Sequence, residues 1–322
     1  LKDNNLEIEN YNLIFNQRKN FNPIKNPKDG IAEAYANIAG WFYEQGLYKF
    51  SAYFSVIGLQ IRPELSSLKY LLSNIYLKLK LDNMVLSSVK NIKLGDLYYS
   101  KTLSIKLKSL SNLGRNETVI SDLKNLVSNF PNRDDYKLYL ADILRSSGFH
   151  RESIDYYDNL IKEITDPKKD DWGIFYSRGI SHERLKNWKL SEKDLLKAIE
   201  LKPDAAYVLN YLGYSWLERK INLKKALKLI SEANELEPND AFITDSLGWA
   251  YFLLGEYEKS IKILEQAILI LPFDSTLNDH LGDAYWKVGR KLEAFSQWKK
   301  VLLYDPDFEY KSRVVHKITF GL

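Results

Sequence analysis

Two carboxylates have a spacing that could support acid/base chemistry. Asp279 and Asp283 stand four residues apart, so on a helix both side chains lie on one face. Carboxylates that line a solvated channel are the commoner explanation of such a pair. No metal-ligand spacing connects the four histidines, which are His150, His182, His280 and His316. Because cysteine, a phosphate-binding Gly-Lys loop and a Gly-x-Ser-x-Gly elbow are also absent, the sequence predicts a non-enzyme without metal or cofactor.

The composition is that of an ordinary globular protein. Of the 322 residues, 45% are hydrophobic and 27% are charged, and the net charge is only +4. Basic residues are interspersed with acidic ones, and basic runs such as Lys224-Lys225 are short, which argues against a nucleic-acid partner. The longest apolar run, from Trp249 to Leu254, is far shorter than the ~20 residues of a membrane span. We therefore expect no transmembrane segment in this chain.

Regularly spaced prolines and glycines indicate an internal repeat. Four prolines follow one another at intervals of 35, 34 and 34 residues: Pro203, Pro238, Pro272 and Pro306. A Leu-Gly pair recurs with the same period, at Leu212-Gly213, Leu247-Gly248 and Leu281-Gly282. Independent markers that keep one period predict an array whose small units stack on one another and share a continuous core.

Each unit has the pattern of two helices joined by a turn. In the unit that begins at Ala241, helical spacing continues to Gly255, resumes after it and ends at Pro272. Gly248 and Ala267 are expected where the two helices cross, because a larger side chain would force the backbones apart. Gly255 suits a turn that needs a left-handed backbone. The sequence therefore predicts an all-α protein built from helical hairpins.

This unit resembles the tetratricopeptide repeat (TPR). That pattern has Leu-Gly at positions seven and eight, an aromatic residue at eleven, and small residues at eight, twenty and twenty-seven. The unit from Ala241 matches it with Leu247, Gly248, Tyr251, Ser260 and Ala267, whereas other units depart from it at Arg178 and Val301. The resemblance implies a right-handed superhelical solenoid of about eight helix-turn-helix units. Their expected first residues are Ala32, Ser66, Ser100, Asp134, Trp172, Ala206, Ala241 and Ser275.

The strength of the signature varies along the chain. Residues 32–171 are expected to form four degenerate units, and residues 172–308 four well-formed ones. Residues 1–31 fit no whole unit and are expected to contain the end of an earlier repeat and a connecting strap. Residues 309–322 are expected to form a capping helix over the exposed end of the array. Because the chain opens with Leu1 rather than Met, we expect a mature or truncated product whose targeting segment is not visible.

In the TPR family, a concave groove binds protein or peptide partners through defined positions of each unit. Carried onto this sequence, those positions predict a groove lined by Tyr176, Tyr207, Asn210, Tyr214, Phe242, Asp245, Trp249, Asp279, Asp283, Trp286 and Lys287. Aromatic rings offer rigid contact area, and amides and carboxylates can pair with peptide groups. Trp249 and Tyr214 are expected to be exposed in the groove, whereas position eleven is expected to be core, at Trp216, Tyr251 and Tyr285. The basic clamp of chaperone-binding members is absent, because Asp245 and Trp249 stand at its positions in one unit.

A narrower resemblance concerns residues 172–305. The stretches Leu209–Trp216, Asp245–Trp249 and Asn278–Trp286 are similar to segments of proteobacterial TPR outer-membrane lipoproteins. Some of those are adaptors that recruit a periplasmic carboxyl-terminal processing protease and its cell-wall hydrolase substrates. The resemblance implies a bacterial adaptor in the periplasm, at the outer membrane, with such a protease or hydrolase as partner. A cytoplasmic assembly or regulatory scaffold, and the binding half of an enzyme with an upstream catalytic domain, remain alternatives.

Overall fold

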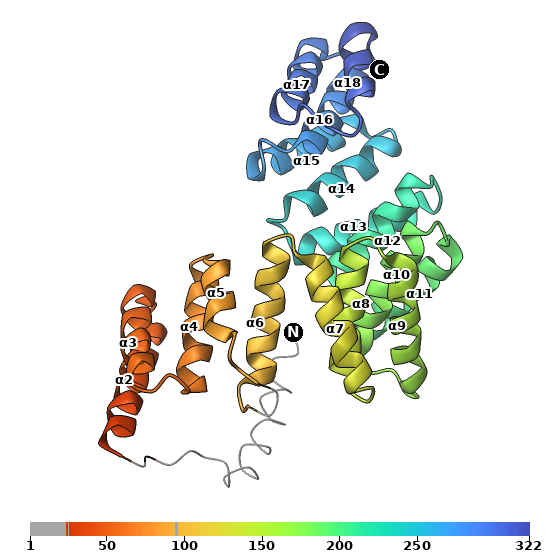
Figure 1. Ribbon diagram of the computed structural model, residues 1–322. Coiled ribbons are helices and arrows are strands. Elements are labelled where there is room, and N and C mark those ends of the chain that lie inside the picture. The colour runs from red at the N-terminus through yellow and green to blue at the C-terminus, as the bar shows by residue number, and fades with distance from the viewer. Residues whose placement is uncertain (1–23, 25, 94–95) are drawn as a thin grey trace. The chain divides into compact units, whose positions relative to one another are not determined.

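The computed structural model describes residues 24, 26–93 and 96–322, which form helices and contain no strand (Figure 1). Successive helices pair into eight hairpins, so the described part of the chain has the predicted all-α TPR solenoid fold. No helix in it is long and apolar enough to cross a membrane. The chain divides into two compact units after Pro131, which we call unit 1 and unit 2. This division follows packing between hairpins, whereas the expected boundary at residue 171 follows the strength of the repeat signature.

Unit 1 contains three hairpins. Their helices are α2 (Pro27–Glu44) and α3 (Tyr48–Ile61), α4 (Ser66–Lys78) and α5 (Asp82–Val89), and α6 (Tyr99–Asn112) and α7 (Asn116–Asn129). Helix α2 begins within the expected strap, because Asn26 caps it and accepts a hydrogen bond from the Asp29 N–H at 3.1 Å. Residues 1–23 and 25, which make up most of the expected N-terminal segment, lie outside the described residues.

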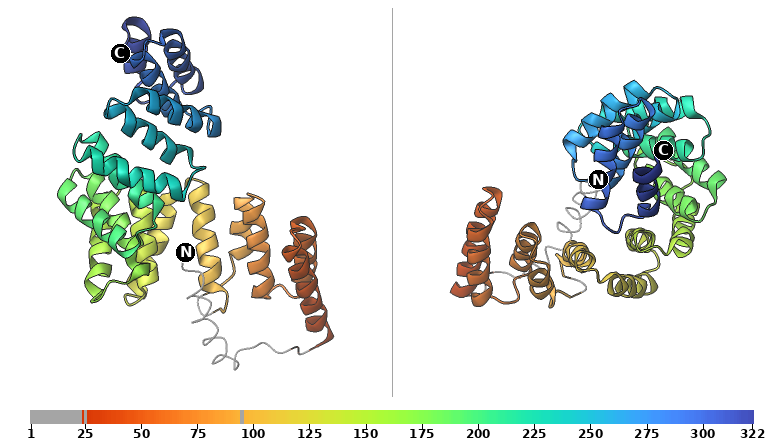
Figure 2. Two further views of the ribbon diagram at one scale, coloured as in Figure 1. Left: turned by 180° about the vertical axis from the view of Figure 1, so that it is seen from behind. Right: turned by 90° about the horizontal axis from the view of Figure 1, so that it is seen from above.

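Unit 2 contains five hairpins and a final helix. The hairpins are α8 (Asp134–Ser146) with α9 (His150–Glu163), α10 (Trp172–Arg184) with α11 (Trp188–Leu201), α12 (Ala206–Glu218) with α13 (Leu223–Leu236), α14 (Ala241–Leu253) with α15 (Tyr257–Ile270), and α16 (Ser275–Lys287) with α17 (Lys291–Tyr304). A short 3-10 turn, η2 (Lys169–Asp171), precedes α10, and α18 (Lys311–Phe320) lies in the segment expected to cap the array. In Figure 2, right, the hairpins of unit 2 follow a curve and α18 lies on its inner side.

Glycine permits the close approach of the two helices within a hairpin. A Cβ atom at Gly248 would lie 2.6 Å from the side chain of Leu264, and one at Gly282 would lie 2.5 Å from Trp298 Nε1. Gly255 has φ of +81°, the left-handed turn conformation expected from the sequence. The small residues therefore set the hairpin geometry that presents the first helix of each pair.

Stacking of hairpins buries position seven of the repeat in three successive hairpins of unit 2. Leu212, Leu247 and Leu281 occupy position seven of α12, α14 and α16 and are at most 6% exposed. At position eleven, Trp216 and Tyr285 are buried, as expected for core residues, whereas Tyr251 is half-buried. The first helices are thus fixed on their neighbours, and their remaining faces form the candidate groove.

Candidate binding groove

The predicted groove residues come from the first helices α10, α12, α14 and α16, and they differ widely in exposure. Exposed side chains are those of Tyr207, Phe242 and Lys287. Half-buried side chains are those of Tyr176, Asn210, Tyr214, Trp249 and Trp286. Buried side chains are those of Asp245, Asp279 and Asp283. The surface therefore changes character along unit 2, from accessible rings on α12 and α14 to buried carboxylates on α16.

Tyr207 and Phe242 are the most accessible rings of the groove. They occupy position two of α12 and α14, which contact one another, and are 56% and 57% exposed. Asp240 caps α14 by accepting hydrogen bonds from the N–H groups of Phe242 and Ile243 at 2.9 and 3.1 Å. The Asp240 carboxylate also raises the pKa of Tyr207, so that hydroxyl lies near the start of α14. The two rings therefore offer apolar contact area beside the carboxylate of Asp240.

A pair of tyrosines continues the groove towards α10. The rings of Tyr176 on α10 and Tyr211 on α12 meet edge to face, with centroids 5.8 Å apart. Burial, followed by the charge of Glu183, raises the pKa of Tyr211 to about 12, so the hydroxyl stays protonated at neutral pH. The sequence-based set omits Tyr211, although position six of the TPR pattern marks it. The repeat register was therefore sufficient to find this residue.

Asn210 and Tyr214 present polar groups one turn apart on α12. The Oδ1 atom of Asn210 is buried and has no hydrogen-bond partner among the described residues. Burial, followed by the charge of Glu218, raises the pKa of Tyr214, so its hydroxyl also remains a donor at neutral pH. Tyr214 is half-buried, so its hydroxyl can pair with an amide group of a bound chain, whereas the Asn210 Oδ1 atom is enclosed by the protein.

Trp249 is held in a stack instead of standing free. Its ring lies parallel to those of Phe252 and His280, with centroids 4.5 and 4.1 Å away. The His280 Nδ1–H donates to Asp245, with Nδ1 2.9 Å from Oδ2. Burial lowers the pKa of His280, but the charge and hydrogen bond of Asp245 outweigh it, and the pKa is raised. The exposure expected for Trp249 is therefore only partial, and replacing it would disturb this stack.

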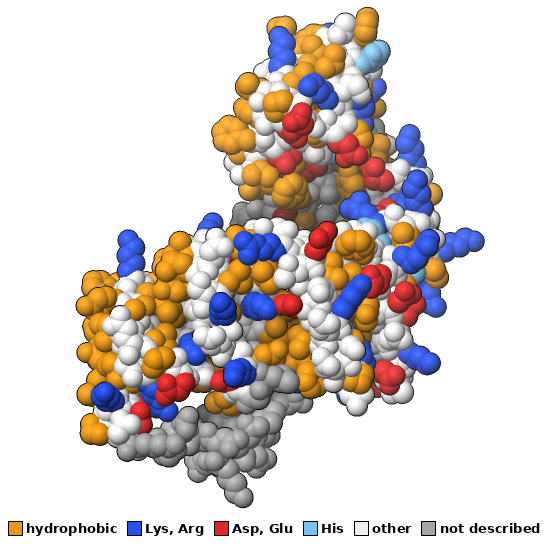
Figure 3. Space-filling model, viewed as in Figure 1, with side chains coloured by type: hydrophobic (Ala, Val, Ile, Leu, Met, Phe, Trp, Pro, Cys, Tyr) orange, Lys and Arg blue, Asp and Glu red, His pale blue; other side chains and the backbone are white. Residues whose placement is uncertain are grey.

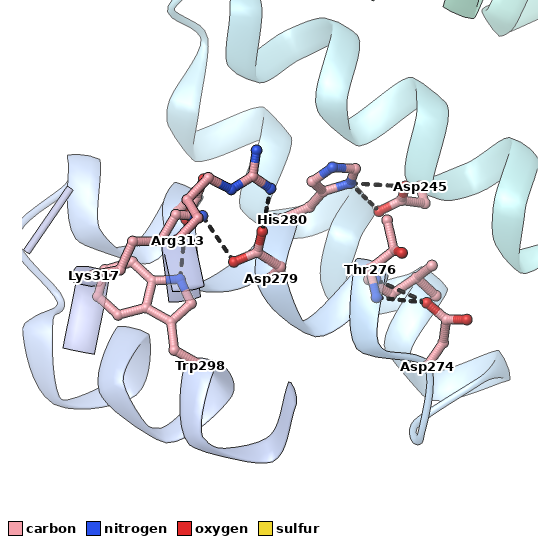
Figure 4. Close-up of polar contacts among 10 residues, drawn as sticks. Asp245, Asp274, Thr276, Asp279, His280, Trp298, Arg313 and Lys317 are labelled. Atoms are coloured by element: carbon pink, nitrogen blue, oxygen red, sulfur yellow. Dashed lines mark hydrogen bonds and ion pairs between the residues drawn. The ribbon is translucent and has the colours of Figure 1, made fainter. Parts of the chain in front are cut away.

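Helix α18 covers the carboxylates of α16, which the sequence predicts to face a solvated channel. Lys317 Nζ lies 2.7 Å from Asp279 Oδ1 (Figure 4). It also lies 2.6 Å from Asp283 Oδ1. Arg313 adds a hydrogen bond of 2.8 Å to Asp279 Oδ2, and the Trp298 indole donates to Asp283 over 3.0 Å. Asp279 is 1% exposed and Asp283 is 5% exposed, so the expectation of a solvated pair is corrected.

The same contacts leave the two carboxylates unsuited to acid/base chemistry on a ligand. Burial, and then the charge of Asp279, raises the pKa of Asp283, while Lys317 acts in the opposite direction. Lys317 lies between the two groups and occupies the space in which a substrate would have to lie. The described residues also contain no group of three or more His, Asp or Glu side chains placed to hold a metal. The side chains suited to contact with a ligand are the aromatic rings and tyrosine hydroxyls in the open part of the groove, on α10, α12 and the start of α14.

Comparisons with known proteins agree with this architecture. The family profile of the tetratricopeptide repeat matches residues 246–272, which run from within α14 to just beyond the end of α15. No curated protein matches the chain significantly. A structure of the APC/C hetero-tetramer Cut9–Hcn1 matches with a TM-score of 0.62 and 17% identity, over 85% of this chain and 52% of that one. MamA (residues 41 to the end) from Desulfovibrio magneticus RS-1 matches with a TM-score of 0.48 and 20% identity, over 55% and 98%.

At these identities the likeness establishes the fold alone, a TPR solenoid. The chain spans about half the length of the Cut9–Hcn1 chain that it matches.

Proposed function

We propose that this protein is a non-catalytic scaffold that binds a polypeptide partner along α10, α12 and the start of α14. The observation that carries the proposal is the pair Tyr207 and Phe242. These large rings stand at the same repeat position on adjacent helices and are more than half exposed, beside half-buried polar groups. Aromatic anchors with polar neighbours are typical of protein interfaces.

Helix α18 supports a helical segment as the kind of partner that fits this surface. It lies against the first helix α16, buries Val314 completely and pairs Lys317 with two carboxylates. The inner side of unit 2 therefore accommodates a helix of this chain by combining apolar contact with matched charge. We propose that a partner segment uses the equivalent faces of α12 and α14, which α18 leaves open at Tyr207 and Phe242.

The double variant Tyr207→Ser with Phe242→Ser tests the proposal. Because both side chains are exposed, the helical circular dichroism and the melting temperature should stay close to those of the unchanged protein. Capture of the partner from native cells, quantified by mass spectrometry, should fall strongly. Leu196→Ser is the control, since Leu196 is 47% exposed on the second helix α11. Equal capture by all three proteins would refute a role for this surface.

We propose further that the scaffold works in the bacterial envelope, as an adaptor for a periplasmic processing protease or a cell-wall hydrolase. The support is the similarity of the stretches Leu209–Trp216, Asp245–Trp249 and Asn278–Trp286 to envelope adaptors. Fractionation of native cells with an antibody against this chain tests the location. Recovery in the cytoplasmic fraction would instead favour the assembly or regulatory scaffold.

A further inference from the structure

The turns between the helices of a hairpin show an unusual choice of residue in unit 2. Each turn contains a residue with a left-handed backbone, and at three of them it is Gly148, Gly255 or Gly289, with φ between +81° and +85°. At the turns after α10 and α12 the residue is Lys186 or Lys220, with φ of +62° and +54°. Glycine adopts this conformation without steric strain, whereas a residue with a Cβ atom does not. Two turns thus keep a lysine where the backbone favours glycine.

These lysines belong to a larger set of cations on the same edge. We call it the turn edge, and it consists of Arg184, Lys186, Lys189, Lys220, Lys224 and Lys225, all of them exposed. Figure 3 shows Lys and Arg side chains gathered at the right-hand side of the view, over the turns α10–α11 and α12–α13.

The charge of the turn edge is largely unpaired. Within the described part of the chain, neither Lys186 nor Lys220 forms an ion pair. Arg184 has only Glu183 nearby, at 3.9 Å, and that carboxylate already accepts from Arg219 at 2.8 Å. The edge is therefore positive and accessible.

The turn edge lies at the carboxyl-terminal ends of α10 and α12, at the opposite end of the first helices from Tyr207 and Phe242. Burial raises the pKa of Tyr211, and the charges of Arg184 and Arg219 act against that rise, so these arginines lie close to the groove tyrosine. His150 on α9 has a pKa lowered by burial and then by the charges of Arg184 and Arg145. Arginines from three successive hairpins thus act on the side chains of one surface.

The acidic groups of the groove do not offset this charge. Asp279 and Asp283 are paired with Lys317 and Arg313, and Asp245 is paired with His280. These three carboxylates are therefore already paired with cations of the chain itself. Along the turns after α10 and α12, six exposed cations outnumber Glu183 and Glu218, whereas Asp240 and Glu237 lie near Tyr207 at the other end of α12.

From these contacts we infer that the partner is an acidic polypeptide segment, which contacts the groove tyrosines and places its carboxylates along the turn edge. This inference rests on the proposed function and adds the chemistry of the partner. A peptide fits better than a phosphate polymer because Glu183 and Glu218 lie among the cations and would repel a uniformly charged backbone. A peptide can place neutral residues opposite those two carboxylates.

The test uses the double variant Lys186→Gly with Lys220→Gly. Glycine removes both charges and relieves the steric strain of a left-handed backbone conformation. The variant should therefore be at least as stable as the unchanged protein. Loss of binding therefore cannot be attributed to unfolding. The matched control is Lys80→Gly in unit 1, where Lys80 has φ of +57° at the equivalent turn between α4 and α5.

Binding is measured by fluorescence anisotropy with a short glutamate-rich peptide and its glutamine counterpart, at low and high ionic strength. We expect the full chain to bind the glutamate peptide more tightly, with a loss of affinity in high salt. The double variant should bind it about fivefold to twentyfold more weakly, since accessible charges steer and select partners. Lys80→Gly should bind like the unchanged protein.

Three results would overturn the inference. They are equal binding of the two peptides, unchanged affinity in the double variant, or an equal loss in Lys80→Gly. A further arm uses vesicles of phosphatidylglycerol and of phosphatidylcholine. Charge-dependent binding to the anionic vesicles without binding to the glutamate peptide would replace the acidic polypeptide with a lipid surface. If instead the Tyr207→Ser/Phe242→Ser variant loses native partner capture while the lysine double variant retains it, the proposed function stands and the acidic partner is rejected.

Discussion

Lys317 Nζ lies 2.7 Å from Asp279 Oδ1, and this pair joins the last helix to the last hairpin in a buried setting. Lys317→Met should leave Asp279 and Asp283 without their shared cation and lower the free energy of unfolding by about 3–5 kcal/mol. Urea denaturation followed by circular dichroism measures this change. Lys311→Met on the exposed side of α18 is the control and should have little effect. If Lys317→Met is as stable as that control, the ion pairs of Lys317 do not hold α18 on α16.

The His280–Asp245 pair should make stability depend on pH. The pKa of His280 in the folded protein is raised, so its contribution is complete below the unfolded value of about 6.5 and is lost as the pH rises through the folded value. The urea midpoint should therefore fall as the pH rises above about 6.5. The pKa of Asp283 is also raised, so its contribution to stability is likewise lost with rising pH. That loss begins near the usual aspartate pKa of about 4.

His280→Gln should remove most of the decrease in urea midpoint above about pH 6, because glutamine does not titrate. His316→Gln should keep it, since His316 is exposed on α18. A slope that persists unchanged in His280→Gln would assign the dependence to other groups.

The sequence predicted the array better than it predicted the site. Six of the eight hairpins begin at the residue inferred from spacing, because Leu-Gly pairs and prolines fix the period in the last units and the same period extends to the earlier ones. The burial of Asp279 and Asp283 was not predicted, since repeat spacing describes contacts within and between units and does not say where the chain end folds. A signal did exist. Arg313 and Lys317 are four residues apart and complement two aspartates with the same spacing.

The close helix crossing at Gly248 gives a test of the hairpin geometry. Gly248→Ala would place a methyl group 2.6 Å from Leu264 and should destabilise the protein by about 1–3 kcal/mol. Gly173→Ala is the matched control on α10, where no atom lies within 4 Å of the added carbon. There the change should be neutral or stabilising by up to about 1 kcal/mol, because alanine favours the helix. Equal unfolding midpoints for the two variants would contradict the crossing described for α14 and α15.

Position seven offers the sharpest comparison, since the same repeat position has opposite environments in two hairpins. Leu247 on α14 is 6% exposed because the preceding hairpin covers it, whereas Ile38 on α2, in the first described hairpin, is 40% exposed. Leu247→Ala should therefore lower the free energy of unfolding by about 2–5 kcal/mol, and Ile38→Ala by less than about 1 kcal/mol. Urea titrations of the two single variants measure both values. A loss at Ile38 as large as that at Leu247 would mean that the face of α2 is covered in solution, and that the stacking surface of the array continues beyond the first described hairpin.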